Sequence, residues 1–266
     1  MTGPGARLLA LIVLFSAFRY LHDLAKLAIE SSFVDFGSYY TYATLIGRGL
    51  NPLDPEAVAQ VDRALGIRRA GTLAPYPPLF YIALQPLTLL PFPLAAGAWL
   101  AANQACLLGA LGLWLRRVAA AAPVGVAAAL FVVLNYQPLF EDFAVGQVNT
   151  ILLFLVTLAW WAVRADRPWI AAAAVAATLN VKVHYALLLP LLWWIGHARV
   201  CWRAMALAGA GLGITLIIWG PAFHLEYART ILSMPESHQI WTLNFSPRAT
   251  LLRLIGGFVM PTAGAI

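Results

Sequence analysis

The stretch LAAGAWLAANQACLLGALGLWLRR at residues 94–117 decides the fold class of this chain. It carries no charged side chain from Leu94 to Leu115 and then ends in Arg116 and Arg117. A helix needs about 20 apolar residues to cross a hydrocarbon core of about 30 Å, so this run is long enough to span a membrane. Paired arginines directly after such a run are typical of its cytoplasmic end. The sequence therefore predicts a transmembrane helix with a defined direction.

The composition extends this prediction to the whole chain. Of its 266 residues, 62% are hydrophobic and only 11% are charged. Soluble domains contain about 25% charged residues, so this balance indicates an integral membrane protein. The net charge of +6 then reflects cytoplasmic loops rather than a nucleic-acid partner. Cys106 and Cys201 do not suggest a structural disulfide, and no zinc spacing, P-loop or dinucleotide fingerprint is present.

A first helix is expected from Leu8 through Glu30, without a convincing signal-peptide cleavage site. Its second half carries five polar residues on one face: Arg19, His22, Asp23, Lys26 and Glu30. Two interpretations stay open. The stripe is a helix end at the membrane surface, with Arg19–Asp23 and Asp23–Lys26 ion pairs, or it faces a polar cavity in the outer half of the membrane.

Two shorter elements are expected in the segment that follows. Asp54 and Pro55 are typical of a helix start and Gly66 of a helix end. The apolar stripe between them predicts a short helix lying on the membrane surface. Residues 76–93 carry about a dozen apolar residues between proline pairs, which is too few for a span. We expect a half-helix there, at the outer face.

The apolar run at residues 169–194 has basic residues on both flanks and Lys182 near its middle. Because basic residues favour the cytoplasmic side, the positive-inside rule favours a pair of short helices that turn near Lys182 over one straight span. The other long runs alternate in direction across the membrane.

The predicted architecture is therefore all-α and polytopic. We expect a single transmembrane domain over residues 1–266, a bundle of about seven or eight helices by length and loop charge. Its polar surface would lie on the non-cytoplasmic side, built from residues 30–93 and from a second large loop at residues 223–248. The host membrane would be the inner (plasma) membrane of the cell.

Asp35 is the first candidate for chemistry. It follows the first apolar stretch, where a carboxylate costs less than at bilayer depth yet stays close to a lipid-borne substrate. It could act as a general base, as an N-cap or as an interfacial charge. Tyr39 and Tyr40 follow it, and Tyr76 opens the half-helix. Such hydroxyls suit a sugar, and they equally suit a lipid headgroup interface.

Further candidates come from later segments. Lys182 could hold a phosphate as a point charge or extend to the membrane surface, and His184 lies beside it. Gln147 and Asn149 open a helix, where they could bind a sugar or an anion or simply cap the helix. Arg248 is a candidate ligand for a phosphate or sugar in the last loop.

The adjacent carboxylates Glu141 and Asp142 are expected in a loop. They could bind a divalent metal, but a neighbouring acidic pair of this kind is more often solvated. We assign no metal site and no cofactor.

Four segments, taken in order, resemble one known family. They are DFGSYYTYATLIGRGLNP, YPPLFYIALQPLTLLPF, GQVNTILLFLVTLAWW and AAAAVAATLNVKVHYALLLPLLWW, beginning at residues 35, 76, 146 and 171. Together they resemble glycosyltransferase family 87, polytopic enzymes of the GT-C superfamily similar to polyprenyl-phosphate-mannose-dependent mannosyltransferases. The resemblance covers about residues 30 to 250.

The resemblance implies transfer of a hexose, such as mannose, from a polyprenyl-phosphate donor to a glycolipid or glycan hydroxyl on the extracytoplasmic side, with inversion. Such a reaction belongs to glycolipid biosynthesis in the cell envelope. Asp35 would be the base of the first outer loop, and Lys182, with Arg248, would hold the donor phosphate. Many such enzymes need no metal at the reacting centre.

Family members usually continue for more helices, so the C-terminus is expected to be shortened. Two other functions stay open. One is a transporter or flippase for a lipid-linked glycan, which should show an internal repeat. The other is a non-catalytic membrane subunit.

Overall fold

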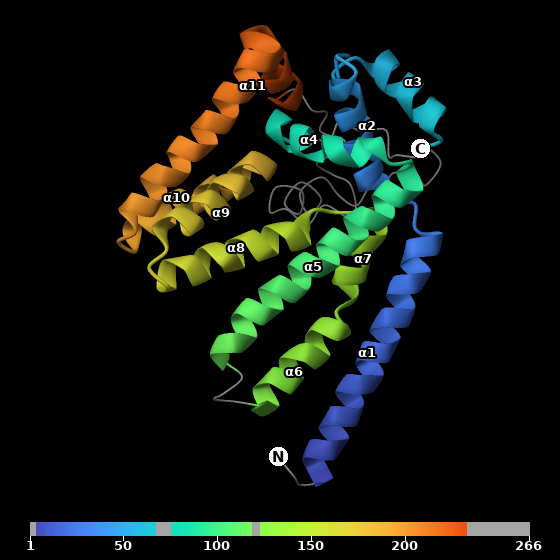
Figure 1. The fold of residues 1–266 in the computed structure, drawn as a ribbon, viewed down its shortest axis with the longest axis vertical. Helices are drawn as coiled ribbons and strands as arrows, with labels where there is room; N and C mark the ends of the chain where they lie inside the picture. Colours follow the sequence, from blue (N-terminus) through green and yellow to red (C-terminus); the bar gives the residue numbers. More distant parts are fainter. Residues whose placement is uncertain (1–3, 68–75, 119–122, 233–266) are drawn as a thin grey trace, which may run out of the picture. The chain divides into compact units, whose positions relative to one another are not determined.

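The computed structural model describes residues 4–67, 76–118 and 123–232, and these parts of the chain are helical without strands (Figure 1). The all-α prediction is confirmed. The α-helices are α1 Pro4–Glu30, α2 Val34–Gly47, α3 Pro55–Leu65, α4 Pro78–Leu84, α5 Phe92–Val118, α6 Pro123–Leu134, α7 Gln137–Val145, α8 Asn149–Arg164, α9 Pro168–Val181, α10 Leu188–Trp194 and α11 Ala198–Leu232. Two short 3₁₀ helices are η1 Gln85–Leu89 and η2 Val183–Leu187.

Three of the described helices are long and apolar enough to cross a membrane: α1, α5 and α11. A fourth span results if α6 and α7, which meet at a bend of 44°, count as one. The span predicted at residues 94–115 is confirmed within α5. Helix α8 has 16 residues and extends about 24 Å, less than a hydrocarbon core of about 30 Å. The described residues thus hold three or four helices of full spanning length, and the other described helices are shorter.

The chain divides into two compact units, residues 1–215 and 216–266, and α11 passes from the first into the second. In the second unit, α11 bends at Gly220 (φ 75°, ψ 167°), a conformation open to glycine alone, just before Pro221. The helix then continues to Leu232. The prediction of a loop at residues 223–248 is therefore wrong for residues 223–232, which are helical. Proline is well tolerated in the first turn of a helix, which explains this restart. Residues 233–248 lie outside the described residues.

Helix α2 is the most enclosed element of the first unit. All of residues 36–46 are buried, and the helix packs against α3, α4, η1 and α5. A helix that is covered all round shows no apolar stripe, so its sequence gives no amphipathic signal. The segment predicted as an outer, polar one therefore contains a core helix.

Helix α3 covers one side of α2. The predicted caps are confirmed: the Asp54 side chain accepts a hydrogen bond from the Glu56 N–H, and Gly66 adopts the left-handed conformation. Val58 on its apolar face is buried, and Thr41 of α2 donates to the Asp62 carboxylate over 2.6 Å. The apolar face of α3 is thus turned to protein, where a membrane-surface helix was expected.

The pair of short helices predicted around Lys182 is confirmed. Helix α9 ends at Val181, Lys182 is extended (φ −136°, ψ 112°), and η2 and α10 follow. Alanines of α9 pack closely on α8, as small residues do between membrane helices, and Leu189 of α10 packs on the same cluster. Helix α8 also packs against α5, so it lies between α5 and α9 (Figure 1). This arrangement brings Lys182 near the start of α8.

Candidate active site

The site begins where the chain turns from α1 into α2. Phe33 adopts a left-handed conformation (φ 46°, ψ 43°), and its N–H donates to the Ala144 carbonyl of α7 over 3.2 Å. This bond fixes the start of α2 against the end of α7. Asp35 lies in the first turn of α2, where the positive end of the helix dipole favours a carboxylate. The side chain is half-buried.

Gln147 is the main partner of Asp35. Its amide Nε2 donates to Asp35 Oδ2 over 2.5 Å. Its Oε1 accepts from the hydroxyls of Tyr39 and Tyr76, at 3.3 and 3.4 Å. The two tyrosine hydroxyls lie 2.7 Å apart. One amide therefore orients the carboxylate while two buried hydroxyls orient the amide.

Gly146 makes this contact possible. It ends α7 with φ 77° and ψ 37°, a left-handed conformation suited to glycine. An added Cβ would lie 2.6 Å from Phe36 Cβ, so only glycine lets α7 approach α2 this closely. The Gly146 carbonyl also accepts a hydrogen bond from Trp99 Nε1 over 2.8 Å. Gly146 thus allows the close approach of α7 to α2, and the next residue, Gln147, is placed where its amide can bond to the Asp35 carboxylate.

Replacing Gly146 with alanine is expected to destabilise the protein strongly. The left-handed backbone costs about 1–2 kcal/mol with a side chain, and overpacking against Phe36 adds about 1–3 kcal/mol. Thermal unfolding of the purified protein in detergent measures the loss. Gly66→Ala is the matched control, since Gly66 has φ 63° but no atom within 4 Å of an added Cβ. Equal midpoints for the two variants would contradict the steric role of Gly146.

Lys182 joins the site from the break after α9. Its Nζ donates to Asn149 Oδ1 over 2.9 Å and lies 5.7 Å from the centre of the Tyr76 ring. Asn149 Nδ2 in turn donates to Asp142 Oδ1 over 3.1 Å. Lys182 interacts electrostatically with both Asp35 and Asp142. One cation thus lies within electrostatic reach of two carboxylates.

Asp142 is the member of this cluster that sequence reasoning did not select as a binding residue. The loop expected at Glu141 and Asp142 is wrong, because both residues lie in α7. Pro138 in the first turn of α7 is the signal that predicts this helix. Among the described residues, no three side chains of the metal-binding types come together in a way that could hold a metal ion.

Burial and hydrogen bonding have opposite effects on the pKa of Asp35. Burial raises the pKa of its carboxyl above the ordinary value, and Asp142 adds to this rise. The hydrogen bond from Gln147 and the charge of Lys182 lower the pKa. Burial also raises the pKa of Tyr39 and of Tyr76, so both remain protonated donors at neutral pH. The anionic form of Asp35 is thus disfavoured by burial and favoured by two specific partners, Gln147 and Lys182.

The other selected residues are placed differently. Tyr40 instead donates to the Leu90 carbonyl over 2.7 Å, and its ring packs on Phe92. The imidazole of His184 stacks on the Tyr185 ring at 5.0 Å. Arg248 lies outside the described residues. The structure brings Asp35, Tyr39, Tyr76, Gln147, Asn149 and Lys182 together, with Asp142 added.

Comparisons with known proteins agree with the resemblance of the motifs. The chain matches glycosyltransferase family 87 over residues 74–265. It is 28% identical over 185 residues to the polyprenol-phosphate-mannose-dependent alpha-(1-2)-phosphatidylinositol pentamannoside mannosyltransferase of Mycobacterium tuberculosis (strain CDC 1551 / Oshkosh). The alignment covers 68% of this chain and 42% of that relative, so the chain spans less than half of the relative's length. No solved structure matches.

The family match covers more than half of the chain. Gln147, Asn149 and Lys182 lie within the matched residues, whereas Asp35 precedes them. The chain belongs to glycosyltransferase family 87.

Proposed function

We propose that this chain transfers a hexose, mannose in the first instance, from a polyprenyl-phosphate donor to a hydroxyl of a lipid or glycan acceptor. Transfer occurs on the extracytoplasmic side and inverts the anomeric carbon. The observation that carries the proposal is the cluster in which Gln147 holds the Asp35 carboxylate and Lys182 lies within electrostatic reach of it. Family membership and the activity named for the mycobacterial relative support the choice of donor and sugar.

Asp35 acts as the general base. Its carboxylate accepts the proton of the acceptor hydroxyl as that oxygen bonds to the anomeric carbon of the donor. The bond from this carbon to the phosphate oxygen breaks, and its electron pair leaves with the polyprenyl phosphate. Because attack comes from the face opposite the phosphate, the anomeric configuration inverts. General-base help of this kind is worth about 10²–10⁴-fold in rate.

Lys182 stabilises the departing phosphate. Its ammonium is a compact charge, and a positively charged group placed in advance is most effective where negative charge develops in the transition state. Asn149 holds Nζ in place from the start of α8. Asp142 positions Asn149 through its amide nitrogen and thus acts through another residue. Asp35 comes from α2 and Lys182 from the break after α9, so base and cation can act on opposite partners of the reacting bond.

The pH dependence of transfer follows from the raised pKa of Asp35. Since only the carboxylate accepts a proton, kcat/KM falls as pH falls through this pKa, and burial places the fall above that of an ordinary carboxyl. Gln147→Leu removes a hydrogen bond that lowers the pKa, so the acidic limb should move to higher pH. Rate profiles of both proteins from pH 4 to 8 measure the shift. Superimposable acidic limbs would exclude Asp35 as the titrating base.

A transfer assay tests the function directly. Membranes that contain the chain are incubated with radiolabelled polyprenyl-phosphate mannose and extracted lipid acceptors, and labelled product is separated by chromatography. Labelled product together with released polyprenyl phosphate supports the proposal. A donor that crosses the membrane without reacting would indicate a flippase, and membranes that only become active with a second protein would indicate a subunit.

A further inference from the structure

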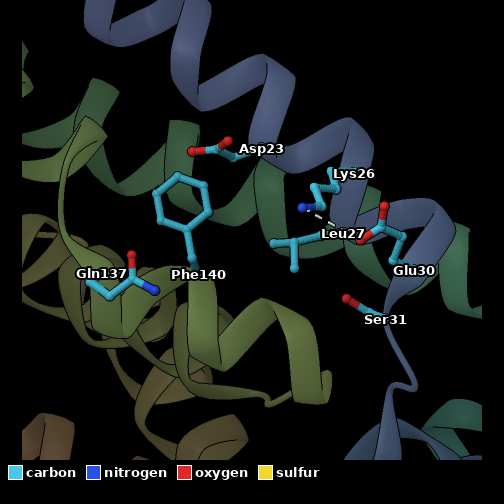
Figure 2. Close-up of a pocket in the computed structure, with 7 residues that line it drawn as sticks. All are labelled: Asp23, Lys26, Leu27, Glu30, Ser31, Gln137 and Phe140. Atoms are coloured by element: carbon cyan, nitrogen blue, oxygen red, sulfur yellow. Dashed lines mark ion pairs between the residues drawn. The ribbon is translucent and has the colours of Figure 1, made fainter.

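A groove separate from the Asp35 cluster lies between α1 and α7. Its cavity volume is about 370 Å³, within the range of about 300–1,000 Å³ usual for small-ligand sites. Figure 2 shows charged side chains of α1 projecting toward the start of α7. The lining residues are Asp23, Lys26, Leu27, Glu30, Ser31, Gln137 and Phe140. Three residues of the polar stripe, Asp23, Lys26 and Glu30, thus line a cavity.

The ion pairs of α1 leave much of this stripe open to a ligand. Arg19 lies 3.9 Å from Asp23, and Lys26 lies 3.7 Å from Glu30 in place of the predicted Asp23. The Lys26 and Glu30 side chains are about 60% exposed, and such exposed pairs are weak, about 0–1 kcal/mol. A ligand can therefore replace their mutual contact with hydrogen bonds of its own.

The groove combines hydrogen-bonding groups with an aromatic wall. Asp23 and Glu30 supply acceptors, Ser31 and Gln137 supply both donors and acceptors, and Lys26 supplies donors. Phe140 is fixed in place by the Tyr20 ring at 5.1 Å, and the Tyr20 hydroxyl donates to Gln104 over 2.5 Å.

The charges of the groove do not favour an anion. Each of its two carboxylates is paired with one cation, Asp23 with Arg19 and Glu30 with Lys26, so the groove has no excess positive charge to attract a free phosphate or a phospholipid phosphate. A neutral ligand rich in hydroxyls suits this balance, because each hydroxyl can donate to a carboxylate and accept from an amide or ammonium. Phe140 is only 7% exposed, so it adds a small apolar contact to these hydrogen-bonding groups.

We propose that this groove binds a sugar unit of the acceptor, an inference that rests on the proposed transferase function. Its position relative to the base supports the assignment. Ser31 lines the groove four residues before Asp35, and a chain of that length spans at most about 14 Å. Helix α7 carries Gln137 and Phe140 at its groove end and Asp142 at the site. A sugar held in the groove can therefore present a further hydroxyl toward Asp35.

Binding of octyl α-mannoside to the purified full chain tests the groove without catalysis. Glu30→Gln and Gln137→Leu should each weaken binding about tenfold, the equivalent of about 1.4 kcal/mol. Glu56→Gln and Gln60→Leu are matched controls on α3, exposed and outside the groove, and should leave binding unchanged. In the transfer assay, the two groove variants should raise the acceptor KM about tenfold without changing the donor KM.

The outcomes separate the two proposals. If the wild type transfers mannose but the groove variants bind the mannoside normally, the groove assignment is wrong and the transferase function stands. If transfer fails but binding is sensitive to both groove variants, the sugar site stands and the function is wrong. Displacement of the mannoside by glycerophosphoethanolamine, but not by methyl α-mannoside, would identify a lipid-headgroup site and overturn the sugar assignment.

Discussion

Asp35→Asn should reduce mannose transfer by about 10²–10⁴-fold, the range expected when a general base is lost. Asparagine keeps the size of the side chain, and its carbonyl oxygen can still accept the hydrogen bond from Gln147. The half-buried site loses a negative charge that burial disfavours, so the fold should be retained or slightly stabilised. The variant therefore separates chemistry from folding. Radiolabelled transfer at saturating donor gives kcat, and thermal unfolding in detergent checks the fold.

Asp54→Asn is the matched control for this experiment. It makes the same change at the start of α3, where asparagine caps a helix as well as aspartate does, so transfer and stability should stay at wild-type level. Turnover in Asp35→Asn within threefold of the wild type would end the role of Asp35 as base. Restored turnover of Asp35→Asn at high pH, where the acceptor ionises more readily, would support it.

Lys182→Met should lower kcat/KM for the donor by about 10²–10³-fold, the loss seen when one stabilising group for a developing anion is removed. Methionine fills a similar volume without charge. Because Lys182 also lowers the pKa of Asp35, the comparison belongs at a pH above the acidic limb. At such a pH, the remaining loss of kcat/KM measures the stabilisation of the donor phosphate and not the protonation of Asp35.

Inhibition by free polyprenyl phosphate supplies a second measurement for Lys182. If the Lys182 ammonium holds the phosphate, the inhibition constant of Lys182→Met should rise by about the same factor by which kcat/KM falls. Arg63→Met, which removes an exposed cation from α3, is the control and should change neither. An unchanged inhibition constant in Lys182→Met would assign the lysine a purely structural role between Asp35 and Asp142.

The long apolar helix and the helix break could be predicted because the length of an apolar run and the charge of its flanks can be read directly along the sequence. The uncharged run before Arg116 gave α5, and basic residues on both flanks gave the break at Lys182. Helix α2 could not be predicted in this way. It is enclosed on all sides by elements that follow it in the chain, so its polar and apolar residues show no period.

Most residues of the Asp35 cluster were candidates from the sequence, but the hydrogen bonds between them could not be predicted. Asp35 and Gln147 are 112 residues apart, and no spacing rule relates them. Asp142 was set aside because an acidic pair in a loop is usually solvated, and its contact with Asn149 exists only once α7 and α8 meet at Gly146. Tyr40 was selected beside Tyr39, yet adjacent residues on a helix face different directions, and its hydroxyl bonds to Leu90 instead.

The 112-residue separation between Asp35 and Gln147 also orders events during biogenesis. At about 5–20 residues per second, the ribosome needs about 6–22 s to reach Gln147 after it has added Asp35. The elements that enclose α2, from α3 to α5 and α7, are likewise made after it. Helix α2 therefore leaves the ribosome with a carboxylate whose partner does not yet exist. Its docking must follow the synthesis of α7 and Gln147, so the hydrogen bond to Asp35 forms only after these later elements have been made.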